Sequence, residues 1–319
     1  MSSRPIWDLT DASIRRLVAA LESLTDGDLA VDILVACGSR AVPFLSSALL
    51  EAEPQSIAVA RCRVVRALGG LGAEHVLLQY LRDWKLPGDP AVAMAEDTVR
   101  GTAAKELLRW PSQELFEVLL VCARERASLG LVEALGTFGR TEAVPVLFHV
   151  LRDDMYGNAA KEALRKTPQR TKIFALQLLN EKRVEEQQSP SILRQLQVSL
   201  ALLSEMEISQ SDWNSIRPYL TWADTEIVLA YAEIGMRHAP AKEHAAIVSN
   251  IFRVLPGCNW LQEARAIEIL EAWKSLARSM AVARRDELLR SGAKPNLLNP
   301  MWRAIDHMLD FPVQSDASR

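Results

Sequence analysis

Two histidines that directly follow a glutamate come nearest, by residue type and spacing, to a metal site. They stand in Glu74-His75 and Glu243-His244, among five histidines in 319 residues. A carboxylate and an imidazole can both ligate a divalent metal, but a site on one helix also needs a ligand one turn away, and neither pair has one. His75 and His149 instead occupy comparable places in two repeats. We therefore expect no metal and no other cofactor.

A glycine-rich stretch, Gly69-Gly70-Leu71-Gly72, is like a phosphate-binding loop only in its composition. In nucleotide-binding proteins such a loop ends in Lys-Ser or Lys-Thr, and this one does not. The chain also lacks the Gly-x-Ser-x-Gly pattern of serine hydrolases. Its four cysteines stand apart without a Cys-x-x-Cys pair, which is typical of small buried side chains in a reducing compartment. We expect a protein without catalytic activity, and a site assembled from distant residues is the open alternative.

A basic stretch between residues 161 and 183 is the strongest charge signal in the chain. Only Glu162 and Glu181 offset its seven cations, which are Lys161, Arg165, Lys166, Arg170, Lys172, Lys182 and Arg183. The residues up to Glu53 are acidic by comparison. Grouped cations attract an acidic protein surface or the phosphate backbone of a nucleic acid, although ordinary solvated helix faces give the same pattern. We expect a protein partner of acidic character, and we place nucleic acid below it.

Three tryptophans and one arginine are further candidates for a binding surface. Trp84 opens an inserted loop in which two prolines and a glycine delay the next helix. Trp213 and Trp222 stand on either side of Arg217, close to turns, where we expect partial exposure. Exposed aromatic and arginine side chains are common hot spots of protein interfaces. Most of the remaining tryptophans are expected in the core, with Trp110 and Trp273 as its anchors.

Four arginines of the second helix pair, in contrast, are expected to hold repeats together. They are Arg61, Arg63, Arg66 and Arg82. Arg61 and Arg63 lie about 200° apart around a helix and cannot share a face, whereas Arg63 and Arg66 can. We expect these side chains to form ion pairs with acidic residues of the next repeat.

The elements that must position these residues repeat along the first half of the chain. The stretch from Val64 to Gly72 recurs from Leu131 to Gly139, and each copy reads as the end of an apolar helix, a glycine turn and the start of a second helix. Pro43 and Pro145 fall in the first turn of such second helices, where a missing N–H removes no hydrogen bond. A pair of helices cannot bury its apolar face alone, so the pairs must stack on one another.

Five helix pairs are predicted after an N-terminal helix, with starts near Leu29, Ile57, Glu96, Arg126 and Met155. Together they form a first domain, residues 1–188. Beyond it the glycine punctuation fades while the helical period continues, which predicts helices over residues 191–207, 211–220, 225–237, 242–255, 259–291 and 299–311. We expect residues 189–319 to be an irregular helical region, which is either a cap that continues the array or a separate helical domain.

The composition agrees with an all-α protein. Hydrophobic residues make up 49% of the chain but aromatic residues only 6%, and the β-branched and aromatic clusters of strands are scarce. A net charge of -3 at pH 7 excludes a general attraction to nucleic acid or acidic lipid. The sequence has no apolar run long enough to cross a membrane, and its first residues lack the apolar core of a secretory signal. We expect a cytoplasmic protein that binds no membrane, and the oligomeric state stays open.

The stretch Ala41-Val42-Pro43-Phe44-Leu45 has a copy from Ala143 to Leu147, and both stand beside glycine turns. In these features residues 29–168 resemble HEAT repeats, particularly the short HEAT-like repeats of phycobilin lyases and bacterial scaffold proteins. The resemblance implies an α-solenoid, a right-handed superhelix of helix pairs with a concave binding surface. The family's di-iron members use His-Glu dyads, which are absent here. It also includes adaptors, bilin lyases and DNA glycosylases. Because the N-terminal repeats are acidic, a glycosylase is disfavoured, and we expect a non-catalytic scaffold or adaptor, with a HEAT-like enzyme or enzyme subunit as the alternative.

Overall fold

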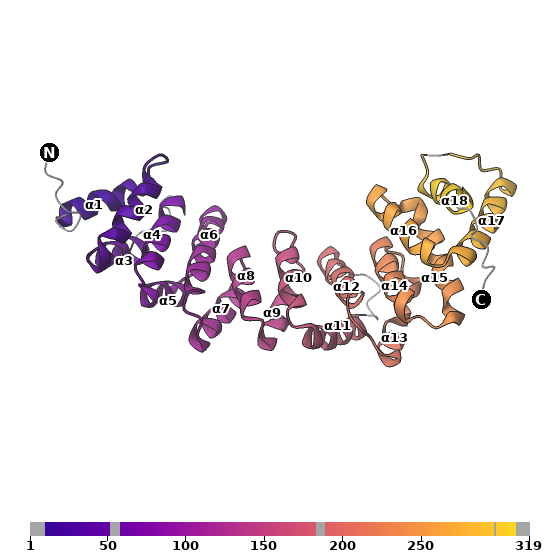
Figure 1. The fold of residues 1–319 in the computed structure, drawn as a ribbon, viewed down its shortest axis with the longest axis horizontal. Coiled ribbons are helices and arrows are strands. Elements are labelled where there is room, and N and C mark those ends of the chain that lie inside the picture. Colours follow the sequence, from indigo (N-terminus) through magenta and orange to yellow (C-terminus); the bar gives the residue numbers. More distant parts are fainter. Residues whose placement is uncertain (1–9, 52–57, 183–188, 297, 311–319) are drawn as a thin grey trace, which may run out of the picture. The chain divides into compact units, whose positions relative to one another are not determined.

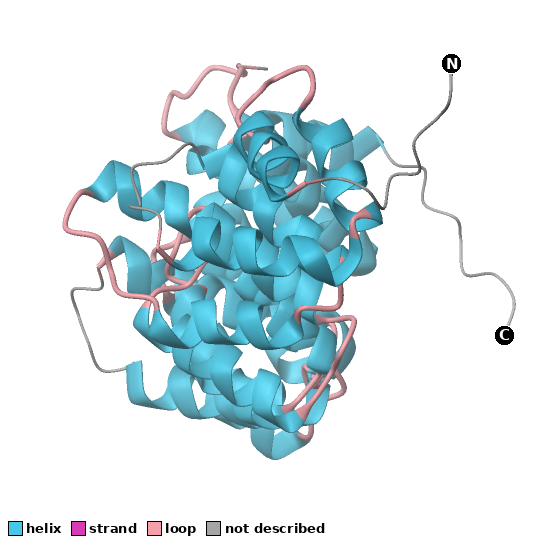
Figure 2. Cartoon of the chain, turned by 90° about the vertical axis from the view of Figure 1, so that its left-hand side faces the viewer, coloured by secondary structure: helices cyan, strands magenta, loops and turns pink. Residues whose placement is uncertain are grey.

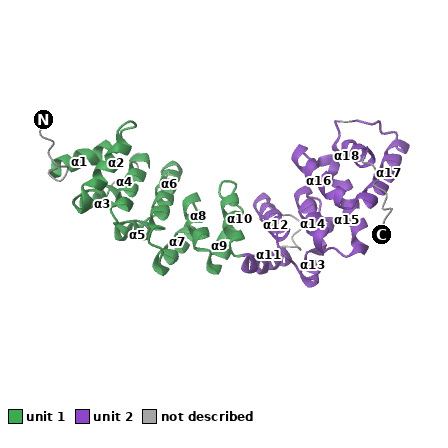
Figure 3. Ribbon diagram, in the orientation of Figure 1, with its two compact units in different colours: residues 1–167 green, residues 168–319 purple. Residues whose placement is uncertain are grey.

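The protein is built from helices throughout the part of the chain that the computed structural model describes, which is residues 10–51, 58–182, 189–296 and 298–310. Within these ranges the regular elements are α-helices and short 3₁₀ turns, and there is no strand (Figures 1 and 2). The predicted all-α class is therefore confirmed. The chain divides into two compact units, Met1–Thr167 and Pro168–Arg319 (Figure 3). The predicted boundary between residues 188 and 189 borders a segment outside the described residues, and it stays a prediction.

Unit 1 arranges its helices in two rows. Its elements are α1 (Asp11–Ala20), α2 (Gly27–Ala36), η2 (Gly38–Ala41), α3 (Val42–Leu50), α4 (Ala58–Gly70), α5 (Glu74–Asp83), α6 (Pro90–Leu107), α7 (Gln113–Glu125), α8 (Leu129–Phe138), η3 (Thr141–Ala143), α9 (Val144–Val150) and α10 (Gly157–Arg165). The even-numbered helices α2 to α10 pack on one another in order, and α3, α5, α7 and α9 form the second row (Figure 1). The first four predicted helix pairs correspond in chain order to α2–α3, α4–α5, α6–α7 and α8–α9. The fifth would join α10 of unit 1 to α11 of unit 2, and it stays a prediction.

Glycine and proline punctuate these pairs as predicted. Gly72 and Gly139 follow α4 and α8 with φ angles of 71° and 59°, a backbone region that side-chain-bearing residues rarely adopt. Pro43 and Pro145 lie in the first turns of α3 and α9. Local turn chemistry is thus sufficient to fix where these helices begin and end.

The third pair begins earlier than the predicted start near Glu96. Asp89 caps α6 by accepting a hydrogen bond from the N–H of Ala91 at 2.7 Å, and Pro90 is the first helical residue. An acidic cap followed by proline is a strong helix start, so α6 begins directly where the inserted loop ends.

Two helices of the first row touch through their backbones. A Cβ atom placed on Gly130 of α8 would collide with the backbone of Gly101 on α6. On the other side of α8, a Cβ on Gly136 would lie 2.7 Å from the Cβ of Ala163 on α10. Small residues therefore bring α6, α8 and α10 closer together than side-chain packing would allow.

Unit 2 continues with paired helices of less regular length. Its elements are α11 (Pro168–Lys182), α12 (Pro190–Leu203), α13 (Gln210–Ile216), η4 (Arg217–Thr221), α14 (Thr225–His238), α15 (Ala241–Val254), η5 (Leu255–Gly257), α16 (Trp260–Ala272), α17 (Lys274–Arg290) and α18 (Pro300–Asp310). Helices α12, α14, α16 and α18 pack in order, and α11 packs on α13 as α15 does on α17.

The single long helix predicted over residues 259–291 is wrong. The chain leaves the helical region at Trp273, with φ -115° and ψ 40°, and forms α16 and α17 instead. No glycine or proline marks this break. The Trp273 ring packs against His244 of α15 at 5.4 Å between centroids, and α17 packs on both α15 and α16. Tertiary packing therefore overrides a locally continuous helical pattern.

Of the helices in the described part of the chain, none combines the length and apolar character needed to cross a membrane.

Candidate functional site

The arginines of α4 bind neighbouring repeats, as the sequence predicted. Arg61 is buried, lies 2.7 Å from Glu96 of α6 and donates to the carbonyl of Leu49 at 3.1 Å. Tyr80 of α5 donates to the same Glu96 carboxylate at 2.8 Å. Burial, together with that carboxylate, raises the pKa of Tyr80. These contacts tie four helices together, α3, α4, α5 and α6, and the groups are inaccessible to a ligand.

The direction of the other pairs corrects part of the prediction. Arg82 pairs with Glu114 of the next repeat, but Arg63 and Arg66 both bind Asp28 of the preceding one, at 3.3 and 2.9 Å. The two guanidinium groups lower the pKa of Asp28. Because Arg63 and Arg66 lie on one face of α4, they reach the same neighbour.

A second buried ionic group holds the α7–α8 loop on α6. Arg100 is fully buried and donates to the carbonyls of Cys122 and Arg126 at 3.1 and 3.2 Å. The Arg126 guanidinium in turn donates to the buried Asp97 carboxylate at 2.8 Å. Burial raises the pKa of Asp97, and both arginines oppose the rise. The predicted candidate Trp84 stacks on this group, with Arg100 3.7 Å from its ring centroid, so it packs the loop instead of facing a partner.

A groove opens beside this ionic group. It consists of two hollows in unit 1, of about 550 and 370 Å³, that share Met94, Met155 and Tyr156. The larger hollow lies between the start of α6, the ends of α7 and α9 and the α9–α10 turn. The smaller one lies between α6 and the start of α8. We call the two hollows together the methionine groove.

Large apolar side chains are exposed around the methionine groove. Met155 is 71% exposed, Met94 55% and Leu129 45%. The turn that carries Met155 is held in place, because the Asp153 carboxylate accepts from the N–H groups of Met155 and Tyr156 at 2.7 and 3.1 Å. Apolar side chains that gather at one hollow on a protein surface are typical of a binding site. The methionine groove is therefore the candidate functional site.

The charges in the groove are largely occupied by contacts within the protein. Asp97 is held by Arg126, Asp153 by backbone N–H groups, and Lys105 by Glu133 at 2.5 Å. Burial and the carboxylates of Asp97 and Asp153 raise the pKa of Tyr156, so its hydroxyl stays protonated. Within the described residues no group of three or more His, Cys, Asp or Glu is placed to hold a metal ion. The lining can bind an apolar segment and donate hydrogen bonds at its edges.

The predicted basic stretch is divided between the two units. Lys161, Arg165 and Lys166 lie on or directly after α10 in unit 1, where Arg165 pairs with Glu162. Arg170 is exposed on α11 in unit 2, Lys182 ends that helix, and Arg183 lies outside the described residues. Lys172 is half-buried and donates to the Glu207 carbonyl at 3.2 Å and to Asp212 at 3.4 Å. Lys172 therefore stabilises the packing of its unit, while Lys166 and Arg170 keep the exposure that docking needs.

The candidates around Arg217 are only partly accessible. The expectation that Trp213 is exposed is wrong: it is fully buried, and its Nε1 donates to Glu243 at 3.0 Å. Trp222 is half-buried against the ring of Tyr219, 4.9 Å away between centroids. Arg217 is exposed and lies 3.4 Å from Glu243. Proximity to a turn did not predict the burial of Trp213, because this side chain lies on α13 and packs inward against Glu243. The expected partial exposure of Trp222 is confirmed.

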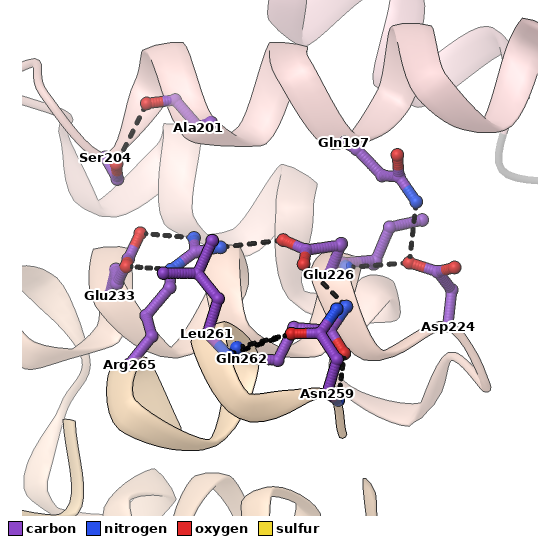
Figure 4. A network of polar contacts seen from close by, with 11 residues as sticks. Gln197, Ala201, Ser204, Asp224, Glu226, Glu233, Asn259, Leu261, Gln262 and Arg265 are labelled. Carbon is purple, nitrogen blue, oxygen red and sulfur yellow. Dashed lines mark hydrogen bonds and ion pairs between the residues drawn. The ribbon is translucent and has the colours of Figure 1, made fainter. Parts of the chain in front are cut away.

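Sequence reasoning did not single out Trp260, the most exposed tryptophan among the described residues. Trp260 is 78% exposed as the first residue of α16, whereas Trp110 and Trp273, expected in the core, are half-buried. Asn259 and Gln262 form a capping box that fixes this helix start, and Gln262 and Arg265 then bind Glu226 and Glu233 of α14 (Figure 4). The polar side chains of the first turns point at α14. Trp260, directly after the cap, is left outside.

The residues of the methionine groove also carried a signal that was not used. Met94, Leu129 and Met155 stand in or next to the first turns of helices, off the stripe of small and apolar residues that each helix buries. An apolar residue at such a place has no core to enter.

Comparison with known proteins adds no identity. No protein-family model matches the chain, and no curated protein is similar to it in sequence.

Proposed function

We propose that this chain is a non-catalytic interaction module of the HEAT-like type, an α-solenoid that binds a segment of a partner protein in the methionine groove. The observation that carries the proposal is the exposure of Met94, Leu129 and Met155 around two joined hollows. Exposed apolar surface is unfavourable in water, and a partner that covers it gains about 25 cal/mol for each Å².

The packing of unit 1 supports the solenoid part of the proposal. The helices α6, α8 and α10 approach one another through Gly101, Gly130 and Gly136. The second row buries larger side chains, such as Leu115, Phe116 and Leu119 of α7. Unequal spacing of the two rows curves a stack of helix pairs toward the closer row. The smaller hollow opens between α6 and α8, which belong to that closer row.

Methionine suits a surface that accepts a peptide segment. Its side chain is unbranched and polarisable, so it adapts to differently shaped apolar partners. The rigid α9–α10 turn keeps Met155 in place, which lowers the entropy lost on binding. The buried carboxylate nearest the groove, Asp97, is engaged by Arg126 and is not free to act as a general base. Binding without chemistry is the function that this lining supports best.

A random-peptide display library, panned against the whole protein, tests the proposal. We expect enriched peptides with two or more large apolar residues, and we expect Met155→Glu to weaken their binding at least about tenfold. The matched control is Val121→Glu, which changes an exposed apolar residue on α7 that lines neither hollow of the groove. If Met155→Glu and Val121→Glu bind the enriched peptides with equal affinity, the groove is not the site. The same holds if hydrogen exchange shows that these peptides protect another part of the surface.

A further inference from the structure

The two methionines at the junction of the groove are more exposed than the other methionines among the described residues. Met155 and Met94 are 71% and 55% exposed, whereas Met301 and Met308 are only 2% and 4% exposed in the core of unit 2. Met236, on α14, is 37% exposed and does not line the groove. A thioether reacts with peroxide in proportion to its access to solvent. Met155 and Met94 are therefore placed to react first.

We propose that Met94 and Met155 form an oxidation-sensitive switch, in which a peroxide converts both thioethers to sulfoxides and thereby prevents segment binding in the groove. This inference rests on the proposed function. In the reaction a sulfur lone pair attacks one oxygen of hydrogen peroxide, the S–O bond forms and the O–O bond breaks. The departing hydroxide takes the proton of the transferred oxygen and leaves as water. Sulfur is oxidised by two electrons and the peroxide is reduced by two.

The position of the two residues makes the change consequential. Both belong to the three side chains that the two hollows share, so a new sulfoxide oxygen at either one lies at the junction of both. A sulfoxide is strongly polar, and an apolar partner offers it no hydrogen-bond donor. The partner would have to leave that oxygen unsatisfied or stay out of the junction.

The cysteines are held mainly in their less reactive, protonated form. Peroxides react with thiolates, and burial raises the pKa of all four free thiols, Cys37, Cys62, Cys122 and Cys258, that of Cys258 to about 11. Their thiolate fraction at neutral pH is therefore low, and Met94 and Met155 are the most exposed sulfur-bearing side chains among the described residues.

The switch is reversible by known chemistry. Methionine sulfoxide reductases use two thiols to remove the oxygen, and they yield the thioether, a disulfide and water. Both stereoisomers of the sulfoxide require treatment, since each has its own reductase. Met94 is exposed near the start of α6 and Met155 in the α9–α10 turn, which gives such an enzyme access to both.

A partition experiment on the whole protein tests the inference. The wild-type chain is treated with hydrogen peroxide until about half of Met155 is oxidised, passed over a resin carrying a display-selected peptide, and the bound and unbound pools are analysed by peptide mass spectrometry. We expect Met155 and Met94 to oxidise before Met236, with Met301 and Met308 last. We expect sulfoxide at Met94 and Met155 to be depleted at least about tenfold in the bound pool, and sulfoxide at Met236 to be equal in both pools.

Variants separate the groove from general damage. Met236→Leu should keep both the peptide affinity and its loss on oxidation. In the Met94→Leu, Met155→Leu double variant, the ratio of affinities before and after peroxide should be close to one, whatever its starting affinity. Equal sulfoxide content in the two pools would overturn the switch while leaving the proposed function intact. Failure of the untreated wild-type protein to bind any peptide in the groove would overturn both.

Discussion

Substitution of Gly130 by alanine tests the backbone contact on which the closely packed row depends. On an ordinary helix this change is favourable by about 1 kcal/mol, because alanine loses less backbone entropy than glycine. Here the new Cβ meets the Cα, carbonyl carbon and carbonyl oxygen of Gly101, none of which can rotate away. Forcing atoms into a packed interface costs about 1–3 kcal/mol, so we expect a net loss of up to about 2 kcal/mol.

For a unit of this size that loss lowers the melting temperature by about 4–8 °C. Differential scanning calorimetry of the whole chain measures it as a shift of the transition to which unit 1 contributes. The reciprocal change, Gly101→Ala, should cost less, because its Cβ meets the N and Cα of Gly130 at 3.2 and 3.3 Å and needs only a small shift. Gly88→Ala is the matched control, since nothing lies within 4 Å of its Cβ.

A raised melting temperature for Gly130→Ala would refute the reasoning, because it would mean that helix propensity alone decides the outcome. A loss equal to that of Gly88→Ala would do the same. The ordering Gly130, then Gly101, then Gly88 is the result that the close approach requires.

Two further predictions concern charge. Lys166→Glu together with Arg170→Glu should reduce retention on a poly-glutamate resin at low salt and leave the melting temperature within about 2 °C. Lys172→Glu should lower the melting temperature, because Lys172 binds Glu207 and Asp212. Unchanged retention of the double variant would assign the basic stretch to solvated helix faces. The pKa of Asp28 is lowered in the folded state, so its contribution to stability is present above its unfolded pKa and is lost as the pH falls below about 4. Thermal unfolding of Asp28→Asn should therefore differ from wild type at pH 6 and converge with it near pH 2, and a constant difference would contradict the pairing with Arg63 and Arg66.

The pairing of helices could be predicted because its signals are local. Gly72 and Gly139 need a left-handed backbone, and Pro43 and Pro145 need a helix start, whatever the rest of the chain does. The role of the α4 arginines followed from their place inside a repeat. These features depend on one or two residues and their immediate neighbours.

The errors have a different origin. The break at Trp273 comes from packing of α17 on α15 and α16, which no breaker residue announces. Trp213 is buried because Glu243, 30 positions away, accepts its N–H. The methionine groove joins residues of α6, α8 and the α9–α10 turn. Each of these depends on residues brought together only by the fold, so the pattern of a single segment could not contain it.

Helix α6 explains why an apolar site lies where it does. Its buried face carries Glu96, Asp97 and Arg100, which bind Arg61, Arg126 and the backbone at the end of α7 and in the α7–α8 loop. Charged side chains placed inside must be paired, and these pairs fix how the second, third and fourth repeats stack. Near the start of α6 the usual arrangement of side chains is therefore reversed, because the apolar Met94 faces solvent while the charged Asp97 is buried. The ionic group holds the loop that ends at Ser128, and Leu129, directly after that loop, lines the smaller hollow together with Met94. Two of the residues that hold the helix pairs together, Asp97 and Arg126, thus also line the groove, and a change in the stacking would alter the shape of the candidate site directly.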